Sequence, residues 1–213
     1  MPEGAENVVE FENGLKVTAR AFTDKQTASE SFGFNIRKAG ILPVQITFQN
    51  DSEDQVSIEP DQTFLIDDDS QAWPLLSLDQ TYQRSKKHVE VGETAKGAAV
   101  PSLLLGSAGA VAGAAIGIVT GSNVGEAMGK GAAVGAATGA VSGGAKSYTE
   151  TGRKIREDIK SKSLGNRAIQ PGHLSYGILF FPGTPGEEAQ SASRLRVSLK
   201  MGTRQELVVI NLK

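Results

Sequence analysis

The segment Leu195-Arg196-Val197-Ser198-Leu199-Lys200-Met201 alternates apolar and polar side chains without interruption. Successive side chains of a β-strand point to opposite faces, so this period of two predicts a strand with one buried and one solvated face. Residues 15–21 and 44–48 show the same alternation. Strands of this half-buried kind are typical of antiparallel sheets.

Further short segments have the composition of strands and lie between turn-forming residues. They are residues 8–11, 55–58, 63–66, 72–76, 175–181 and 206–212. The turns between them include Glu12-Asn13-Gly14, Asn50-Asp51-Ser52 and Pro182-Gly183. About nine short strands with this spacing predict a mainly β fold, specifically an immunoglobulin-like antiparallel β-sandwich.

A Gly/Ala-rich stretch interrupts this pattern, and no charged residue occurs between Gly97 and Gly125. Glycine recurs at every fourth position in two ladders, which extend beyond this stretch past Glu126 and Lys130. The ladder residues are Gly109, Gly113, Gly117, Gly121, Gly125 and Gly129, followed by Gly131, Gly135, Gly139 and Gly143. Residues four apart share one face of a helix, so each ladder predicts a smooth surface for close helix packing.

We expect residues 98–146 to form a helical hairpin in a membrane, with both ends on the same side. A bilayer core needs about 20 apolar residues, and residues 98–120 meet that length. Glycine costs about 1 kcal/mol per residue in a helix exposed to water, but a backbone in lipid must bond internally. Two alternatives are a flexible Gly/Ala linker and a buried hairpin in a soluble oligomer.

The hairpin is predicted to be an insertion into one β-domain. The strands after Pro171 have only the N-terminal strands as partners, so residues 1–97 and 164–213 should form one discontinuous sandwich. Residues 98–163 are then the insertion. Its last part, residues 153–162, is charged and predicts a solvated helical extension, with Ile155 and Ile159 on one side.

The composition gives little support for catalysis or for a metal or cofactor site. The chain has no cysteine and only two histidines, with His88 expected on an exposed strand edge and His173 in a turn. The acidic groups at residues 51–54 and 67–69 lack the spacing of a calcium loop and predict solvated turns, whereas Trp73 is expected in the core. The net charge of -2 does not favour nucleic acid as a partner.

Two parts of the sequence resemble bacterial envelope lipoproteins. The opening of their immunoglobulin-like domains is similar to Phe32-Gly33-Phe34-Asn35-Ile36 and Ala39-Gly40-Ile41-Leu42-Pro43-Val44, ending in Phe48-Gln49-Asn50. The glycine ladders resemble the glycine-zipper hairpins of outer-membrane lipoproteins, including surface-exclusion lipoproteins of conjugative plasmids. The resemblance implies an outer-membrane location with the sandwich in the periplasm. The lipid-bearing cysteine of such families does not occur in this sequence.

The sequence therefore favours a non-enzymatic subunit of the bacterial envelope. Its expected partners are the lipid bilayer, further copies of itself and another envelope protein. The hairpins would pack through their glycine ladders, with a pore or ring as one arrangement. The alternative is a soluble β-sandwich binding module whose Gly/Ala segment is a linker or an intersubunit clasp.

Overall fold

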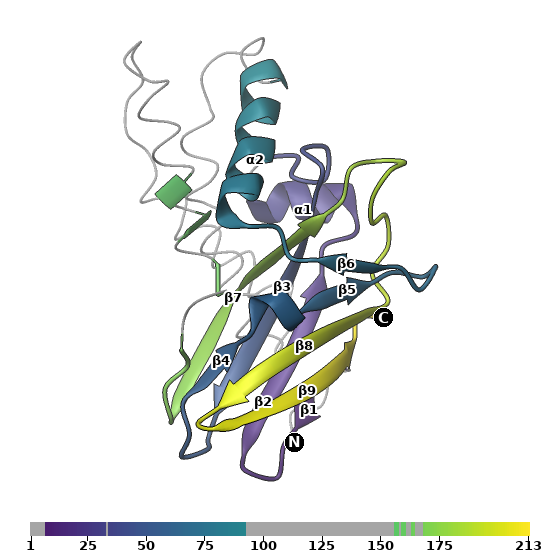
Figure 1. Cartoon of the computed structure of the whole chain (residues 1–213). Helices are drawn as coiled ribbons and strands as arrows, with labels where there is room; N and C mark the ends of the chain where they lie inside the picture. The colour runs from purple at the N-terminus through teal and green to yellow at the C-terminus, as the bar shows by residue number, and fades with distance from the viewer. Residues whose placement is uncertain (1–6, 33, 93–155, 158, 161–162, 165–167) are drawn as a thin grey trace.

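The computed structural model describes residues 7–32, 34–92, 156–157, 159–160, 163–164 and 168–213 (Figure 1). The predicted membrane hairpin at residues 98–146, with all ten ladder glycines, lies outside these described residues.

The described residues form two antiparallel sheets. The first sheet has the order β1 (Val9–Glu10), β2 (Leu15–Ala21), β3 (Ile41–Asn50) and β7 (His173–Pro182). The second contains β4 (Val56–Ile58), β5 (Phe64–Ile66), β6 (Ala72–Pro74), β8 (Arg194–Met201) and β9 (Arg204–Asn211). Each segment that the sequence predicted as a strand overlaps one of these strands. The prediction of a mainly β, antiparallel fold is confirmed.

Strand β8 organises the second sheet, because β4, β5 and β9 all pair with it. Its apolar residues are buried as predicted, since Leu195, Val197, Leu199 and Met201 are at most 1% exposed. Ser198, on the face predicted to be solvated, is also buried, at 2% exposed. The apolar side chains of β8 face those of the first sheet, such as Val17 of β2, in a shared core. Complete burial of an aliphatic side chain stabilises the fold by about 1.5–3 kcal/mol. The two sheets thus pack face to face around one hydrophobic layer (Figure 1).

Strands β3 and β7 join the two parts of the sequence that flank residues 93–155. Their register runs over ten pairs, from Ile41 with Pro182 to Asn50 with His173. Strand β7 is buried on both faces near its end. Leu179 and Phe181 lie in the shared core, whereas Ile178 and Phe180 lie in a second cluster on the outer face of the first sheet.

Two α-helices, α1 (Lys25–Phe32) and α2 (Leu78–Gly92), were missed by the sequence analysis. The placement of His88 on a strand edge was wrong, because this residue lies in α2. Ser77 and Gln80 begin α2 with reciprocal bonds: Ser77 N–H donates to Gln80 Oε1 at 2.8 Å, and Gln80 N–H donates to Ser77 Oγ at 3.1 Å. This capping box satisfies backbone donors that the first helical turn leaves free.

The second cluster covers the outer face of the first sheet. Ala28 and Phe32 of α1 pack there, and the rings of Phe22 and Phe32 meet edge to face at 5.3 Å between centroids. Ile159 belongs to the same cluster and is only 7% exposed.

The sequence predicted a solvated helical extension with Ile155 and Ile159 on one side. Residues 156, 157, 159 and 160 are helical, and Arg156, Glu157 and Lys160 are exposed. Ile159 is not solvated, because its side chain packs against the sandwich.

Candidate functional site

The candidate site is the junction where the chain leaves the sandwich before residues 93–155 and returns after them. Leu76, just before α2, donates its N–H to the carbonyl of Phe180 at 2.8 Å. On the return, Ser163 forms a parallel bridge with Ile178. Phe180 and Ile178 are two residues apart in β7. Both flanks of the 93–155 segment are therefore attached to one strand.

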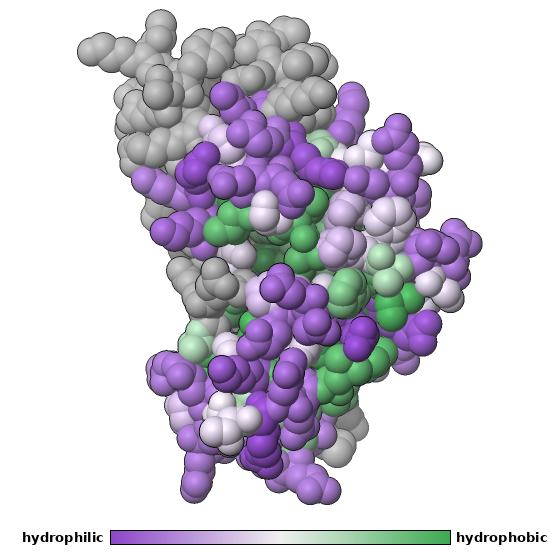
Figure 2. Space-filling view, viewed as in Figure 1, coloured by the Kyte–Doolittle hydropathy of each residue, from purple (hydrophilic) through white to green (hydrophobic). Residues whose placement is uncertain are grey.

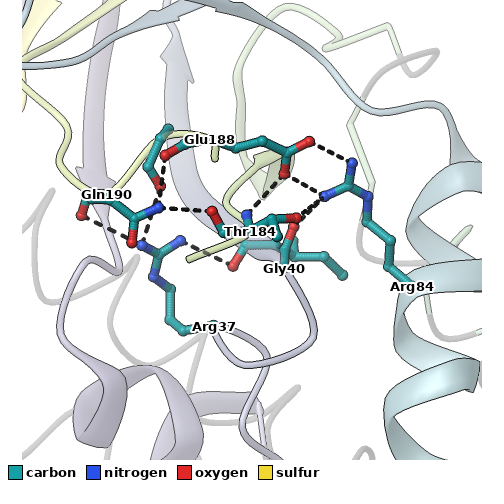
Figure 3. Close-up of polar contacts among 8 residues, drawn as sticks. Arg37, Gly40, Arg84, Thr184, Glu188 and Gln190 are labelled. Carbon is teal, nitrogen blue, oxygen red and sulfur yellow. Dashed lines mark hydrogen bonds and ion pairs between the residues drawn. The ribbon is translucent and has the colours of Figure 1, made fainter. Parts of the chain in front are cut away.

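Arg84 fixes α2 to the sandwich (Figure 3). Its guanidinium donates to both carboxylate oxygens of Glu188, at 2.6 and 2.8 Å, and its Nη1 also donates to the Gly40 carbonyl at 2.6 Å. The side chains of Arg84 and Glu188 are 28% and 21% exposed. A bidentate ion pair between two largely buried side chains is stronger and more directional than an exposed ion pair.

The Arg84 bonds keep Glu188 ionised. They lower the pKa of Glu188 to about 2, with a further contribution from the Thr184 N–H, which donates to Oε2 at 2.8 Å. The same hydrogen bonds raise the pKa of Arg84. At neutral pH the pair is thus fully charged, and α2 is held to the loop at residues 183–190.

Arg37 holds the other side of this loop (Figure 3). It is 4% exposed, and its guanidinium donates to the carbonyls of Ile41, Ala189 and Gln190 at 3.2–3.4 Å. Burial lowers the pKa of Arg37. Gly183 leaves the space for this side chain, because a Cβ there would collide with Arg37 Nη1 and lie 2.8 Å from the Leu42 nitrogen.

A second set of contacts joins the returning chain to the start of α2. The Arg156 guanidinium lies 3.2 Å from an Asp79 carboxylate oxygen and 4.7 Å from the centroid of the Tyr82 ring. The ion pair is exposed, at 58% for Arg156 and 77% for Asp79, so the ring contact is the stronger part. These contacts hold the outgoing and returning segments together.

The described contacts of the junction attach both flanks of residues 93–155 to the sandwich. Most of its polar groups bond to one another and to backbone, the buried Arg37 Nε being an exception, and no nucleophile with an adjacent base lies among its described residues. Across the described part of the chain, no group of three His, Asp or Glu residues could hold a metal ion. His173 lies exposed at the start of β7.

One of the predicted solvated turns is built differently. Asp67 is 7% exposed and accepts bonds from the Gln71 N–H and the Trp73 Nε1–H, both at 2.8 Å. The solvated assignment was wrong for Asp67, because its carboxylate closes this turn. Trp73 is partly buried against the shared core.

None of the ten predicted ladder glycines can be placed, because all lie outside the described residues. The described helices do not include one with both the length and the apolar character required to cross a membrane. Comparisons with protein-family models, curated proteins and solved structures found no match to this chain.

Proposed function

We propose that the protein is a non-enzymatic subunit of the bacterial cell envelope, located at the outer membrane with its sandwich in the periplasm. In this proposal residues 98–146 enter the bilayer as a glycine-zipper hairpin, and several copies assemble through the hairpins. The sandwich, of immunoglobulin type, is displayed in the aqueous compartment to meet another envelope protein. The observation that supports this function is the attachment of both flanks of residues 93–155 to β7.

A membrane hairpin requires both of its ends on one side of the bilayer. The sandwich holds the outgoing and returning segments on one strand, β7, and so meets this requirement without rearrangement. The bonds from Arg84 to Glu188 and to Gly40 would also fix the angle at which α2 leaves the sandwich. Subunits that pack through their hairpins would then carry their sandwiches in a defined orientation.

The proposal assigns assembly to the glycine ladders. Helices in lipid associate through close packing, and a leucine on a small-residue face would hold the backbones apart. We expect the double variant Gly113→Leu and Gly117→Leu to form smaller assemblies than the wild type, while its sandwich stays folded. Native mass spectrometry in detergent measures the subunit count, and circular dichroism checks the fold.

The matched control is Ala112→Leu with Ile116→Leu, because Ala112 lies off the ladder and Ile116 is already large. An unchanged subunit count in the glycine variant would contradict the assignment. Fractionation addresses the alternative of a soluble binding module. If the full-length protein stays in the aqueous fraction without detergent, and deletion of residues 98–146 changes nothing, the segment is a linker or an intersubunit clasp.

A further inference from the structure

The outer face of the second sheet carries a row of cations along β8. Arg194, Arg196 and Lys200 alternate with the buried side chains of this strand, so they all point away from the shared core. Neighbouring members two residues apart are separated by about 7 Å along the strand. Because β8 pairs on both sides, this row runs along the middle of the face and not along its edge.

These three cations have no carboxylate within ion-pair distance among the described residues. By contrast, Arg204 and Lys213 pair with Asp54 and Asp68 at 3.3 and 2.7 Å. The cross-strand neighbours of the row are uncharged apart from Glu59, whose N–H donates to the Ser198 carbonyl at 2.9 Å. The 3-10 turn Pro60–Gln62 also packs against β8 and carries Asp61. Three cations therefore lie beside two carboxylates, Glu59 and Asp61, which leaves a small excess of positive charge.

Apolar side chains lie directly beside the row. Leu207 and Val209 of β9, opposite Ser198 and Arg196, are 53% and 48% exposed. On the other side, the Phe64 ring of β5 lies 5.8 Å from the Arg196 guanidinium. Figure 2 shows apolar side chains among hydrophilic ones on the side of the molecule where β8 and β9 face the viewer in Figure 1. The face thus combines charge with aliphatic surface.

We propose that this face binds a membrane surface rich in anionic phospholipid headgroups. The guanidinium and ammonium groups complement the lipid phosphates, and the exposed Leu207 and Val209 side chains reach the boundary of the acyl chains. A second copy docked through the same face would bring like charges together, so the charges favour a lipid over self-association.

The face lies on the opposite side of the sandwich from the junction, because α1 and Ile159 cover the outer face of the first sheet. Headgroup binding therefore needs no contribution from residues 93–155. It does not rest on the proposed insertion of a hairpin.

The test uses the full-length protein and two sets of vesicles, one of phosphatidylcholine and one in which phosphatidylglycerol is mixed in. The variant carries Arg194→Gln, Arg196→Gln and Lys200→Gln. We expect it to bind the anionic vesicles at least roughly tenfold more weakly than the wild type, because each cation near an anionic surface contributes about fivefold. High salt should release the wild type bound through this face, so that the salt-extractable fraction falls to the level of the variant.

The control carries Lys25→Gln, Lys38→Gln and Lys160→Gln, which remove the same charge from exposed sites elsewhere. It should bind anionic vesicles nearly as well as the wild type. Equal salt-extractable binding by the wild type and the β8 variant would overturn the proposal. A second result would also overturn it: the β8 cations are needed for retention on a polyglutamate resin, but the protein shows no preference for anionic vesicles. The partner would then be an acidic protein. Failure of hairpin insertion is distinguishable, since it would remove only the fraction that resists salt and alkaline extraction.

Discussion

Glu188 links the charge state of the junction to the stability of the fold. Its folded-state pKa of about 2 lies below the ordinary value of 4.5, so the ionised form stabilises the folded protein. This stabilisation is complete above pH 4.5 and is lost as the pH falls towards 2. The pair should therefore act as a permanent attachment near neutral pH.

We expect Glu188→Gln to lower the free energy of unfolding by about 1–3 kcal/mol at pH 7, because Arg84 loses its charged acceptor. The difference from the wild type should shrink at pH 3, where part of the wild-type carboxylate becomes protonated during unfolding. Urea titrations at the two pH values measure it. Glu187→Gln, at the exposed neighbouring position, should change stability by less than about 0.5 kcal/mol. A difference between Glu188→Gln and the wild type that does not vary with pH would contradict this explanation.

Local spacing could not have identified these residues. Arg84 and Glu188 are 104 positions apart, and Arg37 reaches Ala189 across 152 positions. Their pairing depends on the loop at residues 183–190 lying against both α2 and the start of β3. Gly183 could be recognised as a turn residue, but its role of making room for Arg37 depends on the folded arrangement.

Among the secondary-structure elements, the strands could be predicted and the helices were missed. The apolar residues of a strand recur at every second position within one short segment, and these apolar residues are buried, as in β8. Helix α1 has only two buried apolar residues, Ala28 and Phe32, so it shows little helical periodicity. Helix α2 carried a usable signal in Ser77 and Gln80, whose spacing is that of a capping box.

The contact between Arg156 and Tyr82 should couple the returning chain to α2. In a double-mutant cycle with Arg156→Gln and Tyr82→Leu, we expect a coupling energy of about 0.5–1 kcal/mol. The measurement is urea unfolding of the four proteins, with amide hydrogen exchange of α2 as a local probe. The cycle with Asp79→Asn should give a smaller coupling, because that ion pair is exposed. Strictly additive effects of Arg156→Gln and Tyr82→Leu would show that the two segments are held by other contacts.

At the scale of the whole molecule, the sandwich should fold without residues 93–155. The described residues of the two hydrophobic clusters come from both sheets, α1 and the returning chain. Arg156, at the start of the returning chain, contacts Tyr82. Gly92 lies about 15 Å along α2 from Tyr82, so a Gly/Ser linker of about ten residues can join Gly92 to Arg156. The shortened protein should show mainly β circular dichroism and a cooperative thermal transition. A disordered product would mean that residues 93–155 are part of the core.

The position of β8 near the end of the sequence also decides when the sandwich can fold during synthesis. Strands β4 and β5 both pair with β8, and β3 pairs with β7, so neither sheet is complete until the C-terminal strands have been made. At about 5–20 residues per second, the ribosome needs roughly 3–13 s to go from residue 146 to residue 211. During that interval the Gly/Ala segment has been synthesised, but the sandwich is not yet complete. A membrane or a chaperone would therefore meet the central segment first, and the sandwich would close afterwards.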